Sequence, residues 1–265
     1  MQEPAEEDLG GTRVLITGST SGLGRAMARA LAAAGARVVV TGRDSSRARA
    51  VAEEVGAGSG RTVGLALDVR EQASIEAGVA AAVSELGGLD VLINNAGLGM
   101  RSVNPNFLTQ AQPFWKVSPD GFRDLVATNL TGYFLMARQV VPYFLSQQHG
   151  RIVNVTMNQE TMRRRGFVPY GPARAGAEAL SEIMAVDLGD TPVTVNLLLP
   201  GGATATGMIP ADAPAQIRAR LLPPNVMDRA ICWLCSRSAS GVHNQRIVAT
   251  TFDQWLRQWE AEAAG

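Results

Sequence analysis

The residues between Thr17 and Gly24 have the types and spacing of a phosphate-binding turn. Glycines follow an apolar run that ends at Ile16, and a segment with helical periodicity comes next. Gly18 permits a tight exit from a strand, and Gly22 lets the backbone approach a pyrophosphate; Gly24 lets the new helix pack closely on that strand. The free N–H groups at the start of such a helix favour an anion. The pattern therefore predicts a dinucleotide site made by Gly18, Ser19, Thr20, Ser21, Gly22, Leu23 and Gly24.

The segments that must position this turn alternate between strand-like and helical patterns. Strand-like apolar runs cover 14–17, 37–41, 62–67, 91–94, 151–156, 194–199 and 246–250. Helical patterns follow the turn as far as Ala34 and then cover 45–55, 71–86, 119–146, 171–188, 226–236 and 252–263. Continuous apolar strands joined by helices are typical of a parallel sheet covered on both faces. We predict an α/β fold, a single Rossmann-like domain with a doubly wound, seven-stranded parallel sheet and helices on both faces.

Domain boundaries and loops follow from the same reading. We expect a flexible tail over residues 1–11 and one domain over 12–265. Two stretches without periodicity, 98–117 and 201–224, follow strand ends. Because open α/β sheets bind ligands at the carboxyl ends of their strands, we expect both to be lids.

Composition excludes several classes of partner. Lys and Arg total 24, as do Asp and Glu, so the net charge is zero and neither nucleic acid nor an anionic membrane is expected as a partner. No apolar run reaches membrane-spanning length, and the acidic start is unlike a signal peptide, which favours a cytoplasmic protein. Cys232 and Cys235 lack a second Cys/His pair, so we expect buried thiols and no metal site. His149 and His243 fall in predicted loops with no paired acid and are interpreted as surface residues.

Ordered motifs along nearly the whole chain resemble those of the short-chain dehydrogenase/reductase (SDR) family. They are Thr17-Gly18-x-x-x-Gly22-x-Gly24, Asp68-Val69, Asn94-Asn95-Ala96-Gly97, Asn129, Tyr170 and Pro200-Gly201. The resemblance implies an NAD(P)-dependent oxidoreductase acting on CH–OH or C=O groups, with Tyr170 as the acid/base. It also implies a homotetramer or homodimer formed through helices 119–146 and 171–188.

The resemblance implies a cofactor role for several further residues. Asp68 and Val69 would contact adenine, and Asn129 would order a water-linked proton relay. The backbone beside the cofactor would be supported by Asn95, Ala96 and Gly97. The nicotinamide end would involve Tyr170, Arg174, Pro200, Gly201, Thr204 and Thr206.

Two positions depart from the family pattern. Met157 stands where the family has a Ser that hydrogen-bonds the reacting carbonyl, and Arg174 stands where it has a Lys that holds the ribose. Tyr170 and Arg174 are four residues apart on one helix, so a positive charge stays beside the phenol. A thioether cannot donate a hydrogen bond, and losing one oxyanion donor typically costs about 2.7–4 kcal/mol. Thr156 and Asn158 are the candidate replacement donors.

The second predicted strand indicates which cofactor is preferred. It ends in Thr41-Gly42-Arg43, without the carboxylate that accepts the ribose hydroxyls of NAD. The guanidinium of Arg43 suits a 2′-phosphate, so we expect NADP(H) to be preferred. Asp44 keeps NAD(H) as the alternative.

The lid region suggests a kind of substrate. Segment 101–115 is longer than the family spacing requires, so we expect an aromatic lid whose Phe114 or Trp115 covers the substrate. The run Arg163–Arg165 opposite it favours an acidic or strongly polar small molecule.

Three functions remain open at this point. The leading reading is an NADP(H)-dependent oxidoreductase acting on a small or medium polar carbonyl, alcohol or C=N substrate. Met157 and Arg174 instead favour a non-redox enzyme performing elimination, isomerisation or cyclisation, or a nucleotide-binding protein without catalysis.

Overall fold

A seven-stranded parallel sheet forms the centre of the computed structural model, which describes residues 7–57 and 62–263. The strands lie in the order β3-β2-β1-β4-β5-β6-β7. Their bounds are β1 Arg13–Ile16, β2 Arg37–Gly42, β3 Thr62–Ala66, β4 Val91–Asn94, β5 Gly150–Val155, β6 Val193–Leu199 and β7 Arg246–Val248. Successive strands wind outward from β1 in one direction and then from β4 in the other. The predicted doubly wound α/β sheet is therefore confirmed.

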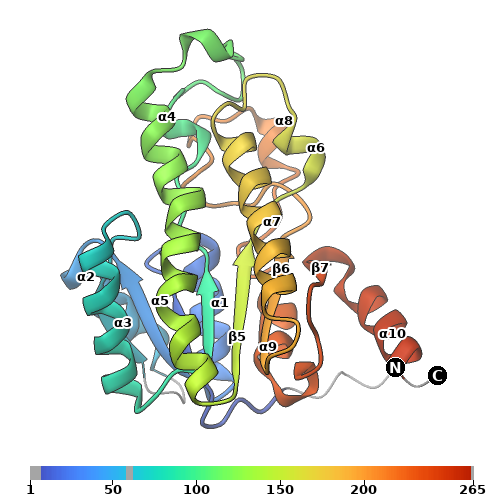
Figure 1. Cartoon of the computed structure of the whole chain (residues 1–265). Helices are drawn as coiled ribbons and strands as arrows, with labels where there is room; N and C mark the ends of the chain where they lie inside the picture. Colours follow the sequence, from blue (N-terminus) through green and yellow to red (C-terminus); the bar gives the residue numbers. More distant parts are fainter. Residues whose placement is uncertain (1–6, 58–61, 264–265) are drawn as a thin grey trace.

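Helices cover both faces of this sheet (Figure 1). Val14 and Ile16 of β1 face one core, whereas Leu15 faces the other. The first core is closed by α1 Gly22–Ala33, α2 Ser45–Val55, α9 Asp228–Cys235 and α10 Phe252–Ala263. The second is closed by α3 Gln72–Leu86, α5 Gly132–Ser146 and α7 Tyr170–Asp187. Strands buried on both sides must be apolar throughout, which explains why continuous apolar runs located them. None of the described helices is long and apolar enough to cross a membrane.

The predicted helix over 119–146 is confirmed, with one local difference: a π-helical turn at Ala127–Thr131 lies between α4 (Pro119–Val126) and α5. The wider turn carries Asn129, whose side chain is fully buried. Asn129 Oδ1 accepts from the Leu98 N–H at 2.7 Å, and Nδ2 donates to the Leu98 carbonyl at 2.9 Å. The tertiary contact with Leu98 thus accompanies a local departure from α-helical geometry.

The packed chain begins before the predicted boundary at Gly11. Leu9 is fully buried, and its N–H donates to the Ala34 carbonyl at 2.8 Å. Residues 1–6 of the expected tail lie outside the described residues.

Both predicted lid segments lie at the carboxyl ends of the strands, together with α6 (Gln159–Met162) and α8 (Ala215–Arg218) (Figure 1). Within the first segment, Asn104 is buried and donates from Nδ2 to the Gln110 carbonyl at 2.7 Å. The two segments meet where a Cβ on Gly99 would lie 3.1 Å from Met208 Cγ. Short 3-10 turns complete the chain at Met100–Ser102, Phe114–Lys116, Arg237–Ala239 and Ala249–Thr251.

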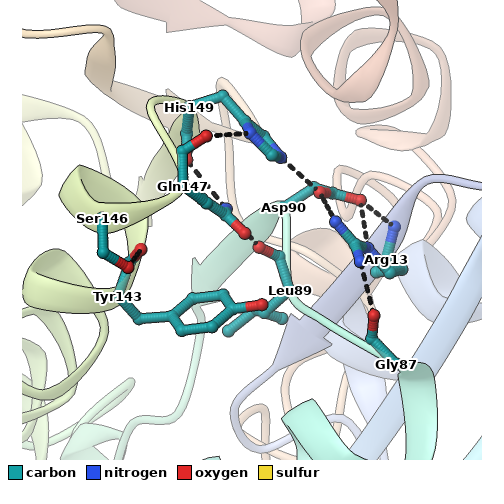
Figure 2. A network of polar contacts seen from close by, with 8 residues as sticks. All are labelled: Arg13, Gly87, Leu89, Asp90, Tyr143, Ser146, Gln147 and His149. Carbon is teal, nitrogen blue, oxygen red and sulfur yellow. Dashed lines mark hydrogen bonds and ion pairs between the residues drawn. The ribbon is translucent and has the colours of Figure 1, made fainter.

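A polar cluster around Asp90 ties β1, β4 and β5 together at the amino ends of these strands (Figure 2). Asp90 Oδ2 accepts from the Arg13 N–H at 2.8 Å and from Arg13 Nε at 2.9 Å. His149 Nε2 lies 2.7 Å from Asp90 Oδ1. The interpretation of His149 as unpaired is therefore wrong. His243 is also part of the packing, because its Nε2 lies 2.8 Å from the Ala185 carbonyl.

The Asp90 cluster generates a stability prediction. Burial raises the pKa of Asp90, but hydrogen bonds from Arg13 and His149 outweigh it, so the pKa is lowered. Such a carboxyl stabilises the fold above its unfolded pKa, near pH 4, and this contribution is lost as the pH falls through the folded value. We expect Asp90→Asn to lower the free energy of unfolding by about 1.5–3 kcal/mol at pH 7, because it removes hydrogen bonds to a charged group. The difference in free energy of unfolding between the variant and the native chain should become smaller at acid pH.

Urea unfolding at pH 7 and at about pH 3 measures both effects. Asp253→Asn is the matched control, because its carboxylate pairs with Arg229 at an exposed site. That control should cost less than about 1 kcal/mol. An equal loss of stability in the two variants would contradict the assignment.

Candidate functional site

The glycine turn has the shape that its sequence predicts. Gly18 and Gly22 have φ values of +62° and +55°, where a side chain would be strained. A Cβ at Gly18 would lie 2.7 Å from Ala96 Cα, and one at Gly22 would lie 3.3 Å from Thr206 Cβ. The first turn of α1 contains no acidic residue, and the Ser21 side chain does not cap it. The turn therefore fits a pyrophosphate at the start of α1.

Two of the predicted cofactor residues hold the turn in place through their side chains. Ser19 is fully buried, where Oγ donates to the Ile16 carbonyl and accepts from the Thr41 N–H, both at 2.9 Å. Asn95 Nδ2 donates to the carbonyls of Thr17 at 2.9 Å and Gly18 at 3.0 Å. These side chains fix the backbone that faces the ligand.

The carboxyl ends of β2 and β3 bring charged groups together at the predicted adenosine end. Hydrogen bonds from Arg70 hold the pKa of Asp68 below its ordinary value, and the charge of Arg43 acts in the same direction. Arg70 Nη2 donates to Asp68 Oδ2 at 2.7 Å. Arg43 is exposed and makes no hydrogen bond or ion pair within residues 7–57 and 62–263. Asp44 caps α2 by accepting from the Arg47 N–H at 3.0 Å.

The first turn of α7 carries the predicted acid/base and its cation. Tyr170 is the first residue of this helix, and Arg174 follows one turn later with 3% of its surface exposed. Arg174 Nη1 donates to the Tyr133 hydroxyl at 2.6 Å and to the Val155 carbonyl at 2.8 Å. Its guanidinium carbon lies 5.5 Å from the Tyr170 ring centroid and 5.4 Å from that of Tyr133. The cation is therefore held between two phenol rings.

This buried cation stays charged. Burial lowers the pKa of Arg174, but the neighbouring phenols of Tyr133 and Tyr170 more than offset it, so the pKa is raised. Arg174 Nε is buried without a hydrogen-bond partner among the described residues. A Cβ at Gly97 would lie 2.5 Å from Arg174 Nη2, so this glycine leaves room for the guanidinium.

Met157 lies two residues beyond the end of β5 and brings no hydrogen-bond donor to the site. The two candidate replacements are engaged with other groups of the protein. Thr156 Oγ1 donates to Glu178 Oε1 at 2.8 Å, and Asn158 Nδ2 donates to the Gly201 carbonyl at 3.1 Å.

A partly buried ion pair lies beside the Met157 backbone, and the sequence reading missed it. Glu178 is 6% exposed and accepts from Arg246 Nε at 3.1 Å. Arg246 Nη2 donates to the Met157 carbonyl at 2.9 Å. The available signal was spacing, because Glu178 lies one turn after Arg174 on the face of α7 that also carries Tyr170. The pair fixes the backbone at the position of the family Ser.

Segment 201–224 closes over the glycine turn. Pro200 is the first residue after β6, and Gly201 follows it with a φ of +96°. Thr204 is buried and forms a β-bridge with Leu222, which places Thr206 against Gly22. A cavity of about 520 Å³ lies between this segment and α1, with Gly22, Arg25, Arg29, Thr206 and Arg218 among its lining.

The aromatic ring that the first lid brings toward Tyr170 is Phe107. Its centroid lies 5.9 Å from that of Phe167, which lies 6.5 Å from Tyr170. Phe114 and Trp115 were expected to cover the substrate, but they are 67% and 70% exposed and contact each other. The 3-10 turn Phe114–Lys116 therefore displays them on the surface. Arg163, Arg164 and Arg165 are exposed, with the Arg164 guanidinium 5.1 Å from the Phe167 ring.

Neither cysteine is placed for metal or redox chemistry. Burial raises the pKa of the Cys232 thiol to about 12 and also raises that of Cys235. A thiol kept protonated in this way is a poor nucleophile and ligand. Within the described part of the chain, no group of three or more His, Cys, Asp or Glu side chains is arranged to hold a metal ion.

Comparison with known proteins agrees with this geometry. The short chain dehydrogenase family matches residues 12–216. Gluconate 5-dehydrogenase of Gluconobacter oxydans is 29% identical over 243 residues, which cover 91% of this chain and 85% of that protein. A 3-oxoacyl-(acyl-carrier-protein) reductase of Vibrio cholerae is 32% identical over 194 residues, covering 73% of this chain and 74% of that one.

Solved structures show the same likeness. The 3-ketoacyl-(acyl-carrier-protein) reductase from Brucella melitensis, complexed with NADH, has a TM-score of 0.79 at 30% identity and covers 91% of this chain and 97% of its own. A metagenomic short-chain oxidoreductase in complex with NADP has a TM-score of 0.73 at 26% identity, with the same coverage of each chain. This chain therefore belongs to the short-chain dehydrogenase/reductase family of oxidoreductases.

Proposed function

We propose that the protein is an NADP(H)-dependent oxidoreductase that transfers a hydride between nicotinamide and a small or medium polar carbonyl, alcohol or C=N substrate. The observation that carries the proposal is the phenol of Tyr170 held 5.5 Å above the buried cation of Arg174, at the same sheet edge as the glycine turn. When bound, the nicotinamide supplies or accepts the hydride. The protein supplies binding, orientation and the proton.

The residues proposed to hold the cofactor follow the cleft from end to end. The turn from Gly18 to Gly24 would take the pyrophosphate, and Asp68 and Val69 would flank the adenine. The nicotinamide end would be lined by Asn95, Ala96, Gly97, Pro200, Gly201, Thr204 and Thr206.

Arg43 and Asp44 support NADP(H) over NAD(H). Asp44, the carboxylate that could take the ribose hydroxyls, is used as the cap of α2, whereas the neighbouring Arg43 guanidinium makes no hydrogen bond or ion pair in the described residues and acts on Asp68 through its charge alone. A free guanidinium recognises a phosphate in a bidentate manner.

Proton transfer is assigned to Tyr170. In reduction its hydroxyl gives a proton to the substrate oxygen or nitrogen, and in oxidation the phenolate takes the proton back. A fixed cation favours the phenolate form. Met157 leaves the developing oxyanion without the second donor of the family pattern, so substrates that are already polarised should react best.

A second candidate is a non-redox or nucleotide-binding protein. Met157 and the hydrogen bonds that tie Arg174 to Tyr133 and Val155 favour it, because both differ from the family arrangement for carbonyl reduction.

We also propose that copies of the chain associate through α5 and α7. Phe134 of α5 is 45% exposed, and Ile183 and Val186 of α7 are 59% and 75% exposed. Large apolar side chains grouped on helix surfaces are typical of subunit interfaces.

The first prediction from this assignment concerns the chemistry. Tyr170→Phe should abolish turnover of every accepted carbonyl compound, because the proton donor is removed. Arg174→Lys should be tolerated or improve turnover, since the charge remains. Met157→Ser should raise kcat/KM for simple ketones by about tenfold or more, because it restores an oxyanion donor. NADPH oxidation with a panel of simple and activated ketones and imines measures all three. Full activity in Tyr170→Phe would show that another group moves the proton, and no NADPH oxidation by the native protein with any of these compounds would favour the second candidate.

The cofactor preference has its own test. Arg43→Ala should weaken NADPH binding about tenfold through loss of a charge-assisted contact, and should leave NADH binding nearly unchanged. Arg37→Ala removes an arginine from the opposite end of β2 and serves as the control. Titration of both reduced cofactors decides the point. Tighter NADH than NADPH binding by the native protein would reverse the assignment.

The aromatic wall beside Tyr170 predicts a specificity effect. Phe107→Ala should change the ratio of kcat/KM between small and large substrates about two- to tenfold, as expected for one aromatic contact. Phe114→Ala is the control and should leave that ratio unchanged, because its ring is exposed. Arg164→Glu should raise KM selectively for acidic substrates. If Phe114→Ala changed this ratio of kcat/KM and Phe107→Ala did not, the substrate would lie beside Phe114.

A further inference from the structure

Tyr133 is a buried phenol for which the proposed mechanism has no direct use. It is the second residue of α5 and is 1% exposed. Its hydroxyl donates to the Val155 carbonyl at 3.0 Å and accepts from Arg174 Nη1 at 2.6 Å. Burial raises the pKa of Tyr133, so the hydroxyl stays neutral and keeps both roles.

Arg174 depends on this hydroxyl because it has few other partners. Within the described residues no carboxylate forms an ion pair with it, since Glu178, one turn later, pairs with Arg246. A long flexible side chain loses considerable rotamer entropy when it is held in one place. The Tyr133 hydroxyl, the Val155 carbonyl and the two phenol rings supply the contacts that offset this loss.

We propose that Tyr133 is a positioning residue whose hydroxyl fixes the guanidinium of Arg174 under the ring of Tyr170. The inference rests on the proposed role of Tyr170 as acid/base. Without the hydroxyl, Nη1 keeps only the Val155 carbonyl as a hydrogen-bond acceptor. The plane of the guanidinium can then rotate with the side chain about the Cδ–Nε bond. The cation then spends less time beneath the Tyr170 ring and favours the phenolate less.

The kinetic test is a double-mutant cycle between Tyr133→Phe and Arg174→Lys. Tyr133→Phe keeps the ring and removes only the hydroxyl. In the native background it should lower kcat/KM at pH 7 about two- to tenfold, the range of one hydrogen bond, and move the half-maximal pH upward by about half a unit. In the Arg174→Lys background it should change neither quantity, because the lysine ammonium is a point charge with rotatable donors and has no planar group for the hydroxyl to orient.

Equal effects in both backgrounds would show that Tyr133 acts without Arg174, and no effect in either would show that the hydroxyl is not needed. Either result overturns the proposal. Tyr143→Phe is the matched control, because Tyr143 lies on the same helix beside the Asp90 cluster, away from the site (Figure 2). It should leave kcat/KM and its pH profile unchanged.

A second readout does not require turnover. The chain contains three tyrosines, so phenol ionisation can be followed by ultraviolet absorbance in a Tyr143→Phe background with two phenols left. The transition that Tyr170→Phe removes is that of Tyr170. Adding Tyr133→Phe should move it to higher pH when residue 174 is Arg and leave it in place when residue 174 is Lys.

The two readouts separate the two hypotheses. If no carbonyl compound is turned over but the absorbance transition moves as expected, the proposed function fails and the positioning role stands. If turnover is robust and the transition does not move, the positioning role fails alone.

Discussion

A charge that is removed from water must be hydrogen-bonded, and the arrangement of this site depends on how that requirement is met for Arg174. The guanidinium draws on three separate elements, because Tyr133 belongs to α5, Val155 to β5, and the space beside Nη2 exists only where Gly97 has no side chain. The contacts of this cation are therefore a neutral hydroxyl, a carbonyl and two phenol rings. No carboxylate among the described residues forms an ion pair with it.

The face of α7 that carries Arg174 also forms hydrogen bonds with polar side chains of β5. Asn154 Nδ2 donates to Ser181 Oγ at 2.7 Å and Asn154 Oδ1 accepts from Asn94 Nδ2 at 2.9 Å. Directional contacts of this kind permit fewer relative positions of helix and strand than apolar packing does. Tyr170 thus lies at the start of a helix whose position against β5 is fixed by hydrogen bonds further along it.

Local sequence patterns were enough for the sheet, because each strand contains a short apolar run that alternates with helical patterns along the chain. The departures at Met157 and Arg174 came from the resemblance to the family motifs. The π-helical turn around Asn129 was missed because local periodicity does not reveal the contact of Asn129 with the backbone of Leu98, which is distant in the sequence. The contacts of Arg246 with Glu178 and Met157 were missed for the same reason. Helical periodicity indicates which face of a helix is buried. It does not indicate which group, distant in the sequence, will form a hydrogen bond or ion pair with a polar side chain on that face.

The link from Arg246 to the Met157 carbonyl joins residues 89 positions apart, and Arg246 lies close to the end of the 265-residue chain. Domains emerge from the ribosome with the N-terminus first. The glycine turn, Asn129 and Tyr170 are all synthesised before β7, so the Met157 carbonyl receives this hydrogen bond only when the last part of the chain has been made. A chain that ended before β7 would lack the contact that holds the backbone at Met157.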